Sequence, residues 1–290
     1  MIIIDLNSLV ISNILQSSRI DIDSVRNIVL NMIRINVKKF RYEFSQNFGI
    51  VLVDDGKWPW RRDYFSFYKA NRRRKKKLSS FNWEMIYTYL DQIKNEIFEN
   101  LPMVYMRHEK CEADDIIATL AQFAALNHDE VLIISSDTDF FQLYSINIRQ
   151  YCPVKKKFLN FHVSPTYDLL FKILYGDKTD GIPNYLTDDD YFVNNEKNEV
   201  EVSIDRFNEL VNIPYGEIES VLSEKERPGF VRNRTLIDFF YIPKNIQMEI
   251  FNLYKESLKQ KKGKGLEITN KYFREHNLKT LLFNIGDFEA

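Results

Sequence analysis

Several acidic residues stand directly after short apolar runs of the kind that form buried strands. The runs IIID, IVLVDD and VLIISSDTD carry Asp5, Asp55, Asp137 and Asp139 at or just beyond their ends. The carboxyl ends of parallel strands lie at one edge of a sheet, so acids from separate strands can share one site. Two other segments hold acids that could reach the same edge: Glu112, Asp114, Asp115, Asp177 and Asp180.

So many like charges in one place are costly unless cations neutralise them. Sites built only from carboxylate oxygens suit hard ions such as Mg²⁺ or Mn²⁺, and no His or Cys accompanies these acids at zinc-like spacing. Two such ions can drive an in-line displacement at phosphorus. Any one of these acids could instead satisfy backbone donors at a strand end or helix start. The whole set at strand ends is harder to explain in that way.

A strongly basic segment follows the second acidic run. Residues 57–77 hold ten Lys or Arg and one acid, Asp63, interleaved with six aromatic residues. Basic and aromatic side chains together suit a phosphate backbone and unstacked bases. A solvated surface loop is the plain alternative. The position of the segment directly after Asp55 favours guidance of a polyanion across a metal site.

Alternating strand and helix patterns must position these residues. Apolar runs predict strands over 2–6, 50–53, 102–106 and 131–134, and helical spacing predicts helices over 22–44, 83–98 and 112–126. This alternation predicts an α/β fold with a mostly parallel sheet. After about residue 165 the chain is predicted to be helical. Its exceptions are an exposed loop over 187–203, a basic flexible link over 255–264 and a tail with one amphipathic helix around 270–283.

The composition limits the class of protein and the compartment in which it is expected to act. The 290 residues carry a formal net charge of only -1, so the charge distribution matters more than its sum. Two cysteines, Cys111 and Cys152, are too few for a disulfide framework and favour a reduced, cytoplasmic compartment. No stretch approaches the ~18–20 apolar residues of a membrane span. The opening segment lacks the basic start of a signal peptide, which favours a buried strand.

Seven segments in order resemble the 5′-nuclease (flap endonuclease) superfamily, and within it the ribonuclease H and 5′-3′ exonuclease group of T-even bacteriophages. They are IIDLNS, VLVDD followed by WRRD, YKANR, CEADD, ISSDTDF, GDKTD and LIDFFYIPKNI. The resemblance implies a PIN-like nuclease core over residues 1–165 with a helical arch at about 57–90. It also implies a helical duplex-binding region with a C-terminal tail over 166–290.

The resemblance also implies roles for the acids and for the basic residues. Asp5, Asp55, Glu112, Asp114 and Asp137 would surround a first Mg²⁺, and Asp115 is a less secure member of this set. Asp139, Asp177 and Asp180 would serve a second Mg²⁺, mostly through water, and Mn²⁺ can substitute. Lys69 and Arg72 would be catalytic residues that contact the scissile phosphate. Residues implied to bind nucleic acid are Arg61, Arg62, Tyr68, Arg73, Arg74 and Lys75.

One departure from the family pattern concerns the turn after Asp180. Many relatives continue with a glycine-containing hairpin that binds duplex phosphates, sometimes through K⁺, whereas this chain has GDKTDGIPNYLTDDD. Asn184 takes the place of a glycine, and close approach of the backbone to phosphate usually needs glycine. The sequence therefore does not predict the usual hairpin or a bound K⁺ here.

The implied function is that of a structure-dependent 5′-3′ exonuclease and flap endonuclease with ribonuclease H activity. Its substrates would be DNA and RNA–DNA duplexes with 5′ ends or flaps, and its task the removal of RNA primers during phage replication. The expected state is a monomer in the bacterial cytoplasm, free of membranes, with a phage single-stranded-DNA-binding protein as a partner of the C-terminal region. Two alternatives stay open: a non-catalytic nucleic-acid-binding protein with a degenerate nuclease fold, and a PIN-type ribonuclease that cleaves single strands.

Overall fold

A single six-stranded sheet forms the centre of the computed structural model, which describes residues 1–44, 49–72, 81–194 and 198–289. The strand order is β3-β2-β1-β4-β5-β6, and all neighbours are parallel except the last pair. The mostly parallel α/β sheet predicted from the sequence is thereby confirmed. The strands are β1 (Ile2–Asp5), β2 (Ile50–Asp54), β3 (Val104–Arg107), β4 (Val131–Ile134), β5 (Ile148–Cys152) and β6 (Lys157–Phe158).

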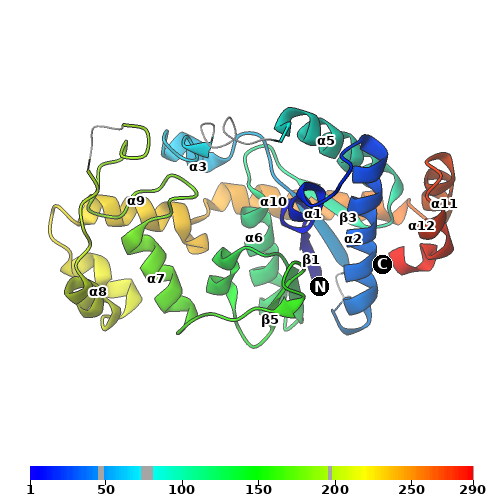
Figure 1. Ribbon diagram of the computed structural model, residues 1–290. Coiled ribbons are helices and arrows are strands. Elements are labelled where there is room, and N and C mark those ends of the chain that lie inside the picture. Colours follow the sequence, from blue (N-terminus) through cyan, green and yellow to red (C-terminus); the bar gives the residue numbers. More distant parts are fainter. Residues whose placement is uncertain (45–48, 73–80, 195–197, 290) are drawn as a thin grey trace.

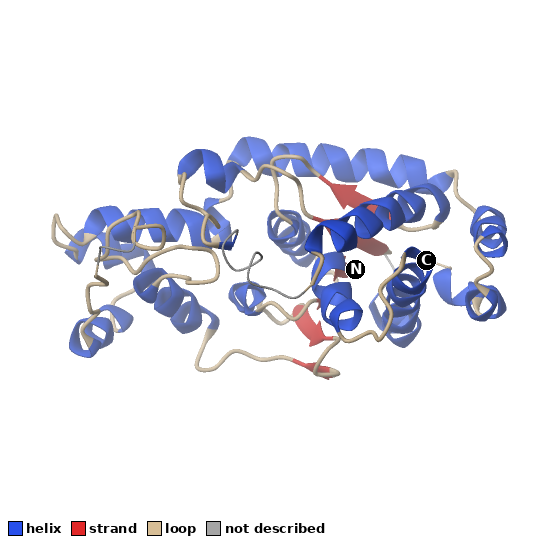
Figure 2. Ribbon diagram, turned by 45° about the horizontal axis from the view of Figure 1, so that its top comes forward, coloured by secondary structure: helices blue, strands red, loops and turns tan. Residues whose placement is uncertain are grey.

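Helices surround this sheet (Figures 1 and 2). The α-helices described are α1 (Leu6–Leu15), α2 (Ile22–Phe44), α3 (Trp60–Tyr64), α5 (Trp83–Asn100), α6 (Ala113–Leu126), α7 (Pro165–Tyr175), α8 (Ile204–Val211), α9 (Arg227–Ile237), α10 (Lys244–Lys262), α11 (Leu266–Glu275) and α12 (Lys279–Phe283). The described residues also form four short 3₁₀ helices, η1 (Thr138–Leu143), η2 (Tyr215–Val221), η3 (Phe239–Tyr241) and η4 (Ile285–Phe288). No helix among them is long and apolar enough to cross a membrane.

The two faces of the sheet belong to two separate cores. Side chains alternate along a strand, so Ile2 and Ile4 of β1 face a core shared with α1, α2 and α5, while Ile3 faces one shared with α6 and α10. Burial on both faces explains why β1, β2 and β4 are continuous apolar runs. It also fixes their register, because a shift of one residue would exchange the two faces.

A third core lies beside the sheet. It joins α7, α8 and α9 to residues around Phe65 and Tyr68 of the basic segment. Figure 1 shows these three helices together at one end of the molecule, with α11 and α12 at the other end. The basic segment thus rests on the helical part of the chain before it reaches residues 73–80, which lie outside the described residues.

Two expectations for the C-terminal part are wrong. The basic link predicted over 255–264 is mostly the end of α10, because Tyr254 and Ser257 are buried and the Ser257 hydroxyl donates to the Tyr105 carbonyl of β3 at 3.2 Å. The tail forms two helices instead of one, because Asn277 adopts a left-handed backbone (φ 53°) between α11 and α12. Asparagine tolerates this conformation better than most residues.

The C-terminal helices complete the cores of the sheet. Ile246 and Ile250 of α10 pack on the face covered by α6, and Phe273 and Leu281 pack on the face covered by α2. The division of the chain near residue 165 stays a prediction. The N-terminal sheet and the C-terminal helices nevertheless share hydrophobic cores. The position of the strand ends therefore depends on packing by both parts of the chain.

Candidate active site

The carboxyl ends of β1, β2 and β4 open into one cavity of about 510 Å³. Two lysines and an arginine from other elements, Lys69, Arg72 and Lys172, complete its wall. Seven of the nine predicted acids line this cavity: Asp5, Asp55, Asp114, Asp137, Asp139, Asp177 and Asp180. The convergence expected from the strand ends is therefore present in the structure.

Asp5 lies at the centre of this edge because β1 is the middle strand between β2 and β4. Its carboxylate accepts hydrogen bonds from the Ser8 backbone N–H at 3.0 Å and the Ser135 hydroxyl at 2.9 Å. Burial raises the pKa of Asp5 to about 7, and the charges of Asp55 and Asp137 add to this effect. The charged form of Asp5 is therefore costly in the absence of a further cation.

The two acids at the end of β2 have different surroundings. Asp54 is only 1% exposed, pairs with Lys94 and accepts from the Tyr105 hydroxyl at 3.1 Å. Asp55 is exposed and accepts from the Ala113 backbone N–H at 2.8 Å, so it joins the end of β2 to the start of α6. Asp54 is neutralised inside the protein, whereas Asp55 faces the cavity.

Asp115 occupies a different place from the other predicted metal ligands. It is fully buried, and its carboxylate accepts from the Glu112 backbone N–H at 2.9 Å, the Arg61 guanidinium at 2.7 Å and the Trp60 indole at 3.2 Å. It thus caps the start of α6 and binds α3, and it does not line the cavity. Asp114, its neighbour, does line the cavity, and burial followed by the charge of Asp137 raises its pKa well above the usual range.

Glu112 also lies outside the set of residues that line the cavity, although its carboxylate is close behind the wall. It accepts from the Tyr68 hydroxyl at 2.7 Å and forms an ion pair with Lys69. Arg61 contacts the same carboxylate at 3.4 Å. The position predicted for Glu112 near the other acids is met, with three side chains of the basic segment directed at it.

Two residues implied to bind nucleic acid lie in the interior. Arg61 is 2% exposed and donates to the Leu236 carbonyl at 2.7 Å. Tyr68 is 4% exposed, and its hydroxyl lies between carboxylates of Glu112 and Asp180. These positions are contrary to the expectation of direct contact with nucleic acid. The polar atoms of both side chains already form ion pairs and hydrogen bonds within the protein.

The remaining residues of that group differ in what the structure describes. Arg62 is partly exposed, with its guanidinium 5.4 Å from the ring centre of the exposed Trp58. This pair lies on the surface, where nucleic acid could reach it. Arg73, Arg74 and Lys75 lie outside the described residues.

Lys69 and Arg72 both reach Asp180. The Arg72 guanidinium lies 2.6 Å from one carboxylate oxygen, and Lys69 Nζ lies 3.5 Å from the other. Lys69 has a left-handed backbone (φ 57°), and its N–H donates to the Asp180 carbonyl at 2.7 Å. Burial works against the charged form, but Lys69, Arg72 and the Tyr68 hydroxyl hold the pKa of Asp180 below its usual value.

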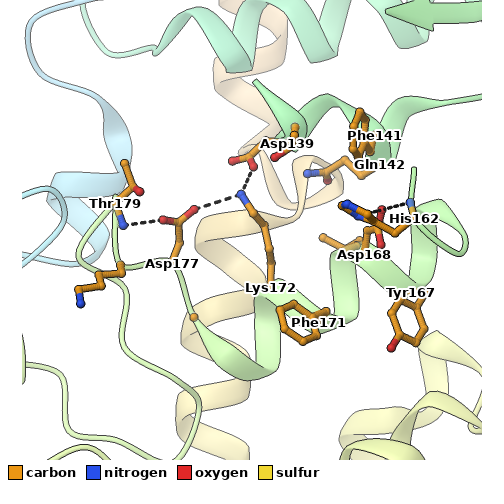
Figure 3. Close-up of a pocket in the computed structure, with 14 residues that line it drawn as sticks. Asp139, Phe141, Gln142, His162, Tyr167, Asp168, Phe171, Lys172, Asp177 and Thr179 are labelled. Carbon is orange, nitrogen blue, oxygen red and sulfur yellow. Dashed lines mark hydrogen bonds and ion pairs between the residues drawn. The ribbon is translucent and has the colours of Figure 1, made fainter. Parts of the chain in front are cut away.

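Lys172 was not predicted from the sequence, although it holds two of the predicted acids. Its ammonium forms an ion pair with Asp139 and lies 3.1 Å from Asp177 (Figure 3). Burial, followed by the charge of Asp137, raises the pKa of Asp139 to about 7 despite this partner. A usable signal was the lone lysine in the apolar helix DLLFKILY, because a lysine among apolar residues usually needs an acidic partner.

The turn after Asp180 is closed by an internal cation. Arg232 of α9 is 8% exposed and donates to the carbonyls of Pro183 and Asn184 at 3.0 Å and of Thr187 at 3.2 Å. Its guanidinium also pairs with Asp189. A K⁺ ion in this turn would compete for the same carbonyl oxygens.

The chemistry of the cavity fits divalent metal ions. Among the residues that the structure describes, no three acids already form a ready-made metal-binding group. Lys69, Arg72 and Lys172 pair with them instead. Burial and the charges of neighbouring acids nevertheless raise the pKa values of Asp5 and Asp139 to about 7. A hard cation held by carboxylate oxygens would supply the missing charge.

The chain is similar to known nucleases over nearly its whole length. Residues 2–167 match the 5′-3′ exonuclease N-terminal resolvase-like domain, and residues 163–288 match the family described as T4 RNase H, C terminal. Ribonuclease H of Enterobacteria phage T4 is 31% identical over 99% of this chain and 95% of its own length. Flap endonuclease Xni of Pseudoalteromonas translucida is 31% identical over 46% of this chain and 51% of its own.

Solved structures with the same fold include a bacteriophage T5 flap endonuclease in complex with DNA and metal ions. It has a TM-score of 0.66 at 15% identity and covers 90% of this chain and 98% of that chain. The T5 5′-exonuclease with bound zinc has a TM-score of 0.64 at 16% identity and covers 90% and 99%. At such identities these matches establish the shared fold alone.

Proposed function

Because this chain belongs to the family of 5′-3′ exonucleases and phage ribonucleases H, it is a nuclease, and we propose that it is a structure-dependent 5′-3′ exonuclease and flap endonuclease with ribonuclease H activity. Its substrates would be DNA and RNA–DNA duplexes with 5′ ends or flaps. One observation carries this proposal: a single cavity gathers seven acids beside Lys69 and Arg72.

Two Mg²⁺ ions would be the cofactors, and Mn²⁺ can substitute. The metal ions in the T5 structures support a divalent requirement. When bound, such ions supply Lewis acidity and an activated water for phosphodiester hydrolysis. One ion would be held by Asp5, Asp55, Asp114 and Asp137 with Glu112 close behind, and the other by Asp139, Asp177 and Asp180, mostly through water.

Lys69 and Arg72 would act on the scissile phosphate. Both line the cavity, and both now neutralise acids. With the acids balanced by metal, their charges are available to a phosphate in the same cavity. Donors fixed in advance where negative charge develops lower the barrier to reaction.

Asp115, Arg61 and Tyr68 would support the site from behind. Asp115 and Arg61 lock α3 against the start of α6, which carries Asp114. Tyr68 spans Glu112 and Asp180, which come from different elements. In this proposal none of the three touches the substrate, and Asp115 is a structural residue and not a metal ligand.

The biological task would be the removal of RNA primers and adjacent DNA during phage replication, in the cytoplasm of the bacterial host. The full-length likeness to the phage ribonuclease H supports this role. The protein would act as a monomer, and its C-terminal region would contact a phage single-stranded-DNA-binding protein.

The first prediction tests the metal-dependent activity directly. Asp137→Asn keeps the shape of a cavity-lining side chain but removes its charge, so cleavage of a 5′-labelled flap duplex in Mg²⁺ should fall to near background while the fold persists. Asp205→Asn, an exposed acid in the first turn of α8, is the matched control and should keep full activity.

Product sizing on flap, nicked and RNA–DNA duplexes, with and without EDTA, separates the alternatives. Binding without cleavage by the parent protein in Mg²⁺ would favour a non-catalytic binding protein. Cleavage of single-stranded RNA alone would favour a PIN-type ribonuclease. Undiminished cleavage in EDTA would contradict the metal site.

A further inference from the structure

A second cavity, of about 590 Å³, adjoins the one that holds the acids (Figure 3). The two cavities share Asp139, Lys172 and Asp177 as part of their walls. Four aromatic rings, those of Phe141, His162, Tyr167 and Phe171, also line the second cavity, together with Asp168, Leu169 and several polar residues. Its size lies in the range of cavities that bind small organic groups. The proposed mechanism uses none of these rings.

Phe171 offers a fixed and accessible ring. It is 45% exposed, yet it stacks on Tyr175 with ring centres 4.5 Å apart and meets Phe207 edge-on at 5.8 Å. These neighbours hold the ring in place while leaving part of it open to the cavity. A ring already held in place loses little conformational entropy when a flat ligand stacks on it.

His162 provides a second ring at the same cavity. Its side chain is 81% exposed, and its ring meets Phe141 edge-on at 6.3 Å. The Asp168 carboxylate accepts from the His162 backbone N–H at 2.9 Å and lies 3.3 Å from Nδ1 of the ring. His162 is thus oriented by its neighbours although it projects into solvent.

Two lysines line the second cavity together with the rings, and one of them, Lys172, is paired with Asp139 and Asp177. Lys172 stands in the shared wall, and Lys178, an exposed residue, lines the second cavity. A nucleic-acid strand that places a phosphate in the acid-lined cavity would bring the adjoining nucleotide to this boundary. Aromatic faces next to cations are what bases and phosphates of an unpaired strand require.

We propose that the second cavity binds a nucleobase of the substrate strand, next to the phosphate held in the acid-lined cavity, by stacking on Phe171 with His162 as a further contact. This inference rests on the proposed nuclease function and adds a base-binding subsite to it. Because every base has a flat aromatic face, the subsite would tolerate any sequence. It would act by fixing the strand that is to be cut.

A base analogue can report the stacking directly. Flap duplexes would carry a single 2-aminopurine at successive positions around the cleavage site, with Ca²⁺ in place of Mg²⁺ to allow binding without turnover. The parent protein should quench the fluorescence at one or two adjacent positions. Phe171→Leu removes the aromatic face but keeps an apolar side chain, so the quenching should disappear and affinity should fall by roughly five-fold or more.

Phe283→Leu is the matched control, because Phe283 of α12 is 94% exposed and does not line this cavity. It should leave both quenching and affinity unchanged. His162→Ala is a second variant that removes little packing, and it should weaken the quenching at the same position. Thermal unfolding of each variant confirms that the comparison is made on folded protein.

Equal quenching and affinity in the parent, Phe171→Leu and His162→Ala would overturn the proposal. Quenching of free 2-aminopurine nucleoside monophosphate without quenching in the duplex would also overturn it, because the site would then bind mononucleotides and not the substrate strand. Failure of the nuclease function itself is distinguishable, since the parent would then leave flap duplexes uncut in Mg²⁺.

Discussion

Lys69 holds together two acids that would otherwise repel each other. Its ammonium pairs with Glu112 and lies 3.5 Å from Asp180. Burial lowers the pKa of Lys69, but the charges of Glu112 and Asp180 outweigh it and raise that pKa above its usual value, so the residue stays charged at any pH of interest. A permanently charged side chain in the wall of the cavity is suited to a growing negative charge on a phosphate.

We therefore expect Lys69→Ala to reduce turnover more than substrate binding, by roughly 10²–10³-fold in kcat. Single-turnover rates at saturating enzyme measure the chemical step alone. Arg62→Ala, which changes a surface cation of the same segment, should instead weaken binding and leave that rate intact. Recovery of the full single-turnover rate by Lys69→Ala would reduce Lys69 to a binding residue.

Lys172 should compete with a metal ion for Asp139 and Asp177. Its ammonium contacts both carboxylates, so a metal ion that binds them, directly or through its water ligands, has to compete with it. Lys172→Met should tighten Mn²⁺ binding by roughly ten-fold, as expected when one charge-assisted contact no longer has to be broken. Calorimetric titration with Mn²⁺ measures this without any substrate.

Lys178→Met is the matched control, because Lys178 is exposed near the same turn and no ion pair is described for it. Its Mn²⁺ affinity should equal that of the parent. Equal affinity in Lys172→Met and the parent would show that Lys172 does not occupy a metal position.

The acids of the cavity were predictable from the sequence, whereas the ion pairs that Lys172 and Arg61 form with the predicted acids were not. An acid after an apolar run marks a strand end, and parallel strands bring their ends together. Lys172 pairs with Asp139 across 33 positions, and Arg61 pairs with Asp115 across 54. No local pattern encodes such pairs. The interior positions of Arg61 and Tyr68 could not be foreseen for the same reason, since a basic aromatic segment suggests an exposed surface.

At the scale of elements, the turn over residues 183–187 is held by two neighbouring residues of α9. Arg232 donates to three of its carbonyls, and Asn233 donates to the Pro183 carbonyl at 2.9 Å. Arg232→Met would leave the buried Thr187 carbonyl without its donor and would remove the partner of Asp189, so the free energy of unfolding should fall by at least about 2 kcal/mol. Denaturant unfolding measures this loss.

Arg227→Met on the same helix is the control, because Arg227 is exposed and its guanidinium donates only to the Leu222 carbonyl among the contacts described. Arg227→Met should lower the free energy of unfolding much less than Arg232→Met does. Since the guanidinium already occupies these carbonyls, duplex binding by the parent should be equal in KCl and NaCl at the same ionic strength. A specific requirement for K⁺ would contradict this account of the turn.

Elements with a strong apolar pattern were predictable, and elements fixed by tertiary contacts were not. The strands at the centre of the sheet are buried on both faces and therefore appear as unbroken apolar runs. The end of α10 is rich in lysine and buries little more than Tyr254 and Ser257, so its sequence resembles a flexible link. The two-residue strand β6 is defined by its pairing with β5 and has no pattern of its own.

Across the whole molecule the formal net charge is only -1, although seven acids are concentrated in one cavity. The acids come from the strand ends, α6, η1 and the turn after α7, so their mutual repulsion acts between elements of the whole fold. Anything that relieves this repulsion should stabilise the entire protein, because the same elements form its hydrophobic cores. Metal binding should therefore be visible in global unfolding.

Burial raises the pKa of both Asp5 and Asp139 to about 7 in the metal-free protein, against roughly 4 in an unfolded chain. Between about pH 4 and pH 7 the folded state thus binds more protons than the unfolded state. The stability that the two acids contribute is therefore lost as pH rises from about 4 through 7. Metal-free protein should accordingly melt at a lower temperature at pH 8 than at pH 5. Mg²⁺ binds the deprotonated acids, so its stabilising effect should be larger at pH 8.

Thermal unfolding with saturating Mg²⁺ or with EDTA tests this linkage. At pH 8 we expect Mg²⁺ to raise the Tm by at least about 5 °C, the size expected for a ligand well above its Kd. Asp5→Asn removes one of the crowded charges, so it should raise the Tm in EDTA and reduce the gain from Mg²⁺. Asp205→Asn should behave as the parent does. A Tm that is independent of Mg²⁺ at pH 8 would show that these acids do not bind the ion in the folded protein.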